Sequence, residues 1–374
     1  MCDAPQHISP NPVQMTTTSS SRGLPAIATR AFFPKAATPE EWLAFHGYMR
    51  LRAEEENPGD PAIDDEMRQR DMLIDWPLFE AHRVLALIDD QIVGSLAMWT
   101  RRPGTPDYEA HARLISADAG VRKCVRRQGI GTALVGELAA FMRSRQITTA
   151  TLSARVGDGT FFLASLGAME KHRMTENRLD LTHVDHGMLQ AWEQRAGLIG
   201  GLTWEVHAPR VPLDRYATLI PQLNVMLNSQ PLGTLELPPF RFDLEQIRAW
   251  YAYMDAHGGD HAMALLCRGD EIAAVSEASW VSNLPDRAFQ NLTAVSPAWR
   301  GRDLAKAVKA RLLRALRERR PSVRWIITSN ANVNAAILAI NTQLGFALHR
   351  EVKTFQIALE TLETALSSRR KHLA

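Results

Sequence analysis

The stretch that decides the fold runs from Val121 to Leu134 and reads VRKCVRRQGIGTAL. The pattern predicts a strand that ends at Val121, a short loop after it, and a helix that begins with Gly129 and Gly131. The first N–H groups of a helix have no acceptor within the helix and attract anions, and glycine lets a phosphate approach the backbone closely. Because Arg126 and Arg127 add positive charge, this stretch predicts a phosphate or pyrophosphate ligand.

The spacing of the glycines narrows the choice of ligand. A dinucleotide-binding fingerprint requires a third glycine where Leu134 stands, and a nucleotide P-loop requires Gly-Lys-Ser/Thr, which this stretch lacks. The spacing Arg126-x-x-Gly129-x-Gly131 instead resembles the acetyl-CoA signature of the GNAT superfamily of N-acetyltransferases. The alternative is a glycine turn that binds no ligand.

A second stretch, from Val295 to Ala305, reads VSPAWRGRDLA and is similar to the same signature. Arg300 stands first in it and Ala305 last, but Asp303 replaces the middle glycine. A carboxylate beside a pyrophosphate is unfavourable unless it turns outward, so we expect weaker CoA binding here. Asp303 at the start of a helix is also an ordinary capping residue.

The elements around the two stretches follow the same order. Hydrophobic periodicity and turn residues predict, in the first half, helices at 40–56, 64–73, 129–145 and 161–166 and strands at 84–88, 92–99, 114–121 and 148–156. The second half predicts helices at 244–256, 303–319 and 334–344 and strands at 262–267, 272–280, 289–295, 323–329 and from Phe346 onward. This is an internal repeat of about 170 residues, which indicates two copies of one α/β domain.

The resemblance to the GNAT superfamily covers roughly residues 30–360, and the mycothiol-synthase type is the best-known tandem relative. It implies an α/β (α+β) fold of two tandem GNAT-like domains, each a mixed, mostly antiparallel, twisted sheet flanked by helices. We expect a disordered tail at 1–28, an N-terminal GNAT domain at 29–182, a linker helix at 183–205 and a C-terminal GNAT domain at 206–374.

The resemblance also implies acetyl-CoA as the co-substrate. Asn334, ahead of the closing Leu344-Gly345-Phe346, matches the family's common CoA-contacting asparagine, whereas Val156 stands there in the first copy. The residues expected to bind CoA are Val121, Arg126, Arg127, Gln128, Gly129, Ile130, Gly131 and Thr132 in the first copy, and Val295, Arg300, Gly301, Arg302, Leu304, Ala305 and Asn334 in the second.

Acetyl transfer to an amine needs a base for the ammonium proton, and an acid for the CoA thiolate assists it. In the family the acid is often a tyrosine, where this chain has Leu163 and Asn341. The family's base often lies on the strand before the signature, in phase with its last valine. The in-phase residues here are Ala119, Ala117 and Ile115 in the first copy, and Thr293, Asn291 and Phe289 in the second.

No in-phase residue is an evident base, so the candidate catalytic residues come from several places: Glu54, Glu55, Glu277, Asn291 and Asn341. For Glu54 and Glu55 the alternative is a solvated helix face. For Glu277 the alternative is a surface position on a strand.

The composition of the chain argues against several other kinds of partner and site. The net charge of +2 does not suggest a dedicated nucleic-acid binder, and no apolar run reaches the roughly 18 residues that span a bilayer. Cys2, Cys124 and Cys267 are far apart and form no CxxC pair, so we expect no metal site, no disulfide framework and a reduced cytoplasmic setting.

The predicted function is that of an acetyl-CoA-dependent N-acetyltransferase acting on a primary amine of a small molecule, either a metabolite or an antibiotic-like compound. We expect no nucleic-acid or membrane partner, and a monomer or homodimer. The alternatives are a non-catalytic acyl-CoA-binding tandem GNAT protein and a protein-modifying acetyltransferase.

Overall fold

The computed structural model describes residues 26–105 and 107–373. Its helices are α1 Pro39–Glu56, α2 Asp65–Leu73, α3 Tyr108–His111, α4 Ile130–Ser144, α5 Asp158–Ser165, α6 His186–Gly197, α7 Leu213–Asn228, α8 Leu244–Ala256, α9 Leu304–Arg319, α10 Ala335–Leu344 and α11 Leu359–Leu373. Its strands are β1 Ala28–Ala31, β2 Phe79–Ile88, β3 Gln91–Arg101, β4 Leu114–Val121, β5 Thr149–Arg155, β6 Met169–Asp180, β7 Thr203–His207, β8 Asp260–Arg268, β9 Glu271–Trp280, β10 Arg287–Val295, β11 Trp325–Ala331 and β12 Ala347–Ala358. The tail expected at 1–28 lies outside the described residues apart from its last three.

The predicted fold class, a mixed α/β fold with a mostly antiparallel sheet flanked by helices, is confirmed. Every helix and strand predicted from periodicity is present, with ends that shift by a few residues. The sequence did not predict β1, β6, β7, α3, α7 or α11. Of these, β6 is rich in charged residues, and α7 contains Pro221 in its interior, so neither carries the usual pattern of its element.

The described residues form two compact units, each of which is described by itself. The first unit contains residues up to 62 together with 82–97 and 118–140. In it β1 pairs antiparallel with β2, and Asp89 and Asp90 make the tight turn into β3 with φ angles of 48° and 61°. One face of α4 is buried, since Ile130, Leu134 and Leu138 are at most 1% exposed, whereas Phe141, which the helical period places on the same face, is half-buried.

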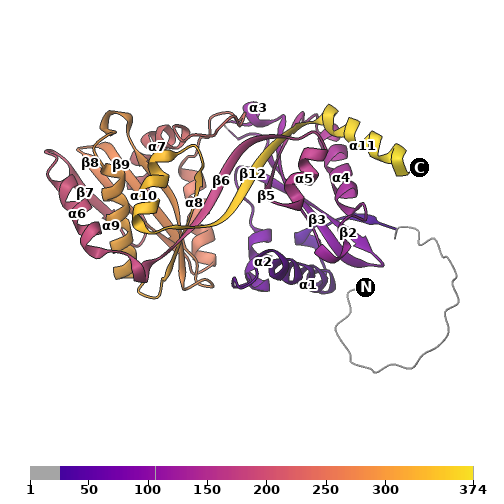
Figure 1. The fold of residues 1–374 in the computed structure, drawn as a ribbon, viewed down its shortest axis with the longest axis horizontal. Helices are drawn as coiled ribbons and strands as arrows, with labels where there is room; N and C mark the ends of the chain where they lie inside the picture. Colours follow the sequence, from indigo (N-terminus) through magenta and orange to yellow (C-terminus); the bar gives the residue numbers. More distant parts are fainter. Residues whose placement is uncertain (1–25, 106, 374) are drawn as a thin grey trace, which may run out of the picture. The chain divides into compact units, whose positions relative to one another are not determined.

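The second unit contains the remaining residues, and its strands follow the order β5-β12-β6-β11-β10-β9-β8-β7. The long strands β6 and β12 run side by side (Figure 1). β12, the last strand of the chain, also pairs with β5 of the first half, while β6 of the first half pairs with β11 of the second. Each half of the sequence therefore contributes a strand to the sheet of the other half.

Helices cover both faces of the β7–β11 part of this sheet. α6 and α9 pack on one face, against the side chains of Ala262, Ala264 and Ala278. α7 and α8 pack on the opposite face, against Met263 and Leu265. Alternation along β8 thus divides its residues between two apolar cores. The apolar stripe of α9 is buried, because its members are at most 1% exposed: Leu304, Val308, Leu312 and Leu316.

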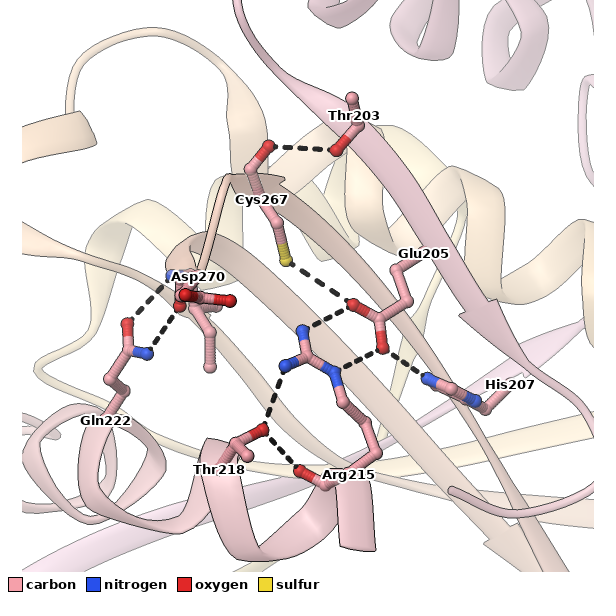
Figure 2. A network of polar contacts seen from close by, with 9 residues as sticks. Thr203, Glu205, His207, Arg215, Thr218, Gln222, Cys267 and Asp270 are labelled. Carbon is pink, nitrogen blue, oxygen red and sulfur yellow. Dashed lines mark hydrogen bonds and ion pairs between the residues drawn. The ribbon is translucent and has the colours of Figure 1, made fainter. Parts of the chain in front are cut away.

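A polar network fixes α7 to the edge strand β7 (Figure 2). Arg215 donates from Nε to Glu205 Oε1 at 2.7 Å and from a terminal nitrogen to Oε2 at 2.6 Å. His207 Nε2 lies 2.6 Å from the same carboxylate. The hydrogen bonds from Arg215 lower the pKa of Glu205 from 4.5 to about 2. Cys267 lies beside this carboxylate, and burial raises the pKa of its thiol to about 11, so the thiol is unreactive at neutral pH.

Replacing Glu205 by glutamine should therefore destabilise the protein at pH 7 by about 1–2 kcal/mol, because the charged, bidentate contact with Arg215 is lost. The folded-state pKa of Glu205 is depressed, so its stabilisation is complete above pH 4.5 and is lost as the pH falls towards about 2. Urea unfolding between pH 7 and pH 3 measures both effects. The variant should lose less stability than wild type over this range, whereas Glu318→Gln, at an exposed carboxylate, should behave as wild type. Parallel stability curves for Glu205→Gln and wild type would contradict the assignment.

Within residues 26–105 and 107–373, none of the helices combines the length and the hydropathy that a membrane-spanning helix requires.

Candidate functional site

The first candidate site is the loop that joins β4 to α4 in the first unit. β4 ends at Val121, one 3₁₀ turn follows at Lys123–Val125, and α4 begins at Ile130. Two residues of this loop adopt left-handed backbone conformations, Arg127 with φ of 67° and Gly129 with φ of 91°. The Gly129 carbonyl accepts from the amide of Ala133 at 2.9 Å, which closes the first turn of α4. The first amides of α4 therefore take no part in the hydrogen bonds between successive turns of the helix. An anion-binding site at a helix start requires this arrangement.

Glu55 of α1 anchors this loop. Its carboxylate accepts from Arg122 Nε at 2.8 Å and from the backbone amide of Lys123 at 2.9 Å. Burial raises the pKa of Glu55, but the hydrogen bonds from Arg122 and Lys123 outweigh it, and the net pKa lies below its usual value. A lowered pKa makes a carboxylate a weaker base. Glu54, the other candidate on this helix, is exposed.

The second loop has the same backbone with different residues. Gly301, with φ of 76°, occupies the position of Arg127, and Asp303, with φ of 57°, occupies the position of Gly129. The prediction that Asp303 is an ordinary cap is wrong, because its side chain makes no capping hydrogen bond to α9. It is 60% exposed and lies 3.2 Å from Lys306 Nζ. The carboxylate thus turns outward, with a cation beside it.

Replacing Asp303 by glycine should strengthen CoA binding at the second loop by about three- to tenfold. The change removes one negative charge beside the expected pyrophosphate, while relief of the left-handed conformation stabilises the free and the bound protein alike. Calorimetric titration with CoA measures the affinity. Asp303→Asn removes the charge but keeps the side-chain size, so it should strengthen binding to the same extent. Identical isotherms for wild type and Asp303→Gly would show that Asp303 does not weaken binding.

The second loop follows a strand that parts from its parallel neighbour. β10 pairs with β11 only up to Gln290 and Thr328, although both strands continue. In the first copy β4 pairs with β5 up to Ala117 and Leu152. Beyond Gln290 and Thr328 the facing backbone groups of β10 and β11 do not pair with each other. Such an open edge suits an extended ligand that carries amides, as the pantetheine arm of CoA does.

A bulge in β10 corrects the predicted strand phase. The pairing with β9 shifts register between Gln290 and Thr293, so one extra residue breaks the alternation. Val295 packs with the core beneath α9, whereas Asn291 reaches Glu277 on the face covered by α7 and α8. The prediction that Asn291 is in phase with Val295 is therefore wrong.

Glu277 of β9 lies opposite this bulge, and its residue is only 7% exposed, so the surface position considered for it is excluded. Asn291 Nδ2 donates to Glu277 Oε2 at 3.0 Å and to Ser279 Oγ at 3.0 Å. His261 of β8, which is fully buried, places Nδ1 3.6 Å from Glu277 Oε1. The sequence analysis did not include His261 among the candidates, because a histidine in a strand pattern carries no signal of its own.

The structure does not bring the other candidates to Glu277. Asn341, at the position of the family's tyrosine, is 2% exposed and donates from Nδ2 to Asn330 Oδ1 at 2.7 Å. Asn334 caps α10, since its Oδ1 accepts from the amide of Ile337 at 3.3 Å. Asn341 thus joins α10 to β11, and Asn334 fixes the start of the same helix.

A repeated sheet in which parallel strands part, each followed by a loop that leads into a helix, defines the class of tandem GNAT proteins. Residues 45–159 match the model of the acetyltransferase (GNAT) family, so this part of the chain is a GNAT-family domain and the resemblance is confirmed. No curated protein matches the sequence of the chain.

Solved structures show the same fold along most of the chain. A tandem GNAT protein from the clavulanic acid biosynthesis pathway is 19% identical, with 89% of this chain and 99% of that chain covered and a TM-score of 0.69. A GCN5-related N-acetyltransferase from Sphaerobacter thermophilus is 16% identical, with 89% and 96% covered and a TM-score of 0.61. A GCN5-related glucosamine N-acetyltransferase region of a fungal GH3 β-N-acetylglucosaminidase is 10% identical, with 90% and 38% covered and a TM-score of 0.62.

Proposed function

We propose that this protein is an acetyl-CoA-dependent N-acetyltransferase that acts in the cytoplasm on a primary amine of a small molecule. The observation that carries the proposal is the pair of loops at the starts of α4 and α9, which share two left-handed positions although their residues differ. We assign one loop to each of two domains, at 29–182 and 206–374, joined by a linker at 183–205.

The residues at both loops fit a pyrophosphate. Gly129 has no Cβ to block the approach of a phosphate, and an added Cβ there would meet only Ile27, at 3.6 Å. Arg126 and Arg300 supply positive charge at equivalent positions. The parted strands would pair with the amides of the pantetheine arm. Acetyl-CoA, when bound, supplies an activated thioester; the chain contributes binding, orientation and proton transfer.

Thiol release from acetyl-CoA, followed with a panel of primary amines and aminoglycosides at pH 7 and pH 9, tests the proposal. An alkylammonium with a pKa near the lysine reference of about 10.4 is almost fully protonated at pH 7. We therefore expect thiol release with at least one amine, at a rate that rises with pH. No release from any amine at either pH would favour a non-catalytic acyl-CoA-binding protein.

A further inference from the structure

We propose that acetyl transfer takes place in the second copy, with Glu277 as the general base and His261 as the residue that positions it. This assignment rests on the proposed function and names the copy and the residues that carry it out.

Glu277 lies next to the closed end of the gap between β10 and β11. That gap begins after Gln290, and the next residue, Asn291, is exposed and donates to the Glu277 carboxylate. The loop at α9 begins at the open end, after Val295. A CoA molecule with its pyrophosphate at the loop and its arm along the gap would therefore place the thioester near Asn291 and Glu277.

The contacts of His261 fix its proton on the side of Glu277. The amide of Val211 donates to His261 Nε2 at 3.3 Å, so Nε2 is an acceptor and Nδ1 carries the hydrogen. Tyr251 donates its hydroxyl proton to the Val211 carbonyl at 2.6 Å and lies 2.9 Å from Nε2. His261 Nδ1 lies 3.6 Å from Glu277 Oε1, which is longer than a hydrogen bond, and it has no other hydrogen-bond partner among the described residues. Asn291 donates a hydrogen bond to the other carboxylate oxygen.

The other ionisable groups around this pair do not compete as bases. Burial raises the pKa of Tyr251 well above its usual value, and burial likewise raises the pKa of Tyr216. Arg210 lies over the Tyr251 ring at 4.6 Å and is held by two carboxylates, donating to Asp260 at 3.0 Å and to Asp255 at 2.9 Å.

The first copy lacks the histidine and the glutamate. Counted from the hairpin turn, Ala81 and Ala97 stand at the positions of His261 and Glu277. Ala117 is the last residue of β4 that pairs with β5, as Gln290 is the last residue of β10 that pairs with β11, so Asp118 stands at the position of Asn291. The strand of the first copy is also covered by a cation. The guanidinium carbon of Arg52 lies only 1.8 Å from the point where a Cβ on Gly120 would stand. Arg52, which forms an ion pair with Glu56, thus occupies the space beside Gly120, and we assign the transfer of the acyl group to the second copy.

The step assigned to Glu277 balances as follows. The Glu277 carboxylate takes one proton from the acceptor ammonium, and the freed nitrogen lone pair forms a bond to the thioester carbonyl carbon. The carbon–sulfur bond then breaks, and CoA leaves as the thiolate. The second proton lost by the nitrogen protonates this thiolate, and the first leaves Glu277 for water.

The test compares variants of the two residues in the full-length protein, with acetyl-CoA and the amine that gives the fastest thiol release. Glu277→Gln should lower kcat by about 100-fold or more at pH 7 and leave CoA affinity in calorimetry unchanged. Its rate should still rise with pH, because the acceptor ammonium then loses its proton only to solvent. His261→Asn keeps an N–H that faces Glu277 and should stay within tenfold of wild type. His261→Leu should lower kcat more than His261→Asn does, with KM for acetyl-CoA unchanged. Glu318→Gln, at an exposed carboxylate of α9, is the matched control with unchanged rate.

Each outcome decides between the two proposals. If wild type releases thiol and Glu277→Gln is equally active, the assignment of Glu277 is wrong while the proposed function stands. If wild type releases no thiol with any amine, the proposed function is wrong and this assignment with it. If Glu277→Gln does not fold, the His261 pair decides, because equal rates and equal pH profiles for His261→Asn and His261→Leu overturn the positioning role.

Discussion

Replacing Lys309 by methionine is expected to make the protein more stable at pH 7, by about 1–3 kcal/mol. Lys309 lies in the middle of α9 and is 1% exposed. Its Nζ donates to Gln290 Oε1 at 2.6 Å and lies 5.3 Å from the centre of the Phe346 ring. A single neutral acceptor does not compensate for the loss of water around an ammonium group. Burial accordingly lowers the pKa of Lys309 from 10.5 to about 7.

This lowered pKa also makes the stability of wild type depend on pH. Between about pH 7 and pH 10.5 the unfolded chain holds the Lys309 proton and the folded chain does not, so stability rises with pH in this window. From pH 7 to pH 9 the gain is about 2 kcal/mol for wild type, and Lys309→Met should lack it. In Lys309→Met, Gln290 Oε1 loses its hydrogen-bond donor. This loss offsets part of the stability that the substitution adds at pH 7.

Urea unfolding at pH 7, 8 and 9 measures both effects. Lys306→Met, one turn earlier on α9, is the matched control, because Lys306 is partly exposed and lies beside Asp303. This control should keep the rise of stability with pH. A Lys309→Met curve parallel to that of wild type would mean that Lys309 stays charged in the folded protein.

Replacing Gly131 by glutamate should weaken CoA binding at the first loop by about 30- to 150-fold. Gly131 is the second residue of α4, so the new carboxylate would lie close to the expected pyrophosphate. Repulsion between these charges at about 5 Å costs about 2–3 kcal/mol in a partly solvated site. The helix itself tolerates the change, because a negative charge in the first turn is favourable to the helix dipole.

Two controls isolate the charge at this position. Gly136→Glu adds the same side chain farther along α4, where an added Cβ has no neighbour within 4 Å, and should bind CoA as wild type does. Gly131→Ala should also bind CoA, since Ala305 stands at the equivalent position of the second copy. Calorimetric titration with CoA reads all three variants. Equal affinities for Gly131→Glu and Gly136→Glu would place the pyrophosphate elsewhere.

The sequence predicted those features that depend on local periodicity. α9 and α4 were predicted with their buried faces, because leucine and valine recur at the helical period. The strand β6 was not predicted, because its apolar residues are interrupted by charged ones. Those charges are satisfied across the sheet, as in the contact of Lys353 Nζ with Glu170 Oε2 at 2.8 Å. Ion pairs between residues far apart in the chain leave no local pattern.

The candidate site was predictable only in part for the same reason. The glycines and arginines of the first loop indicated an anion site, since a helix start is a local feature. Alternate residues of a strand point to opposite faces of the sheet, but the sequence of the strand does not show which face is covered by helices. The burial of Glu277 and His261 could therefore not be predicted. The bulge in β10 adds a residue without any glycine to mark it, and it therefore reversed the predicted phase of Asn291.

β6 and β12 each pair with a strand from the other half of the sequence, and this affects how the protein folds during synthesis on the ribosome. β5 and β6 are joined in the sheet by β12, which ends at Ala358 and is made long after them. At about 5–20 residues per second, the interval between the synthesis of Asp180 and that of Ala358 is roughly 10–35 s. Throughout it, the nascent first half carries two strands with open edges, which are sites for wrong pairing. The first half therefore completes its folding only after the last strand of the chain has left the ribosome.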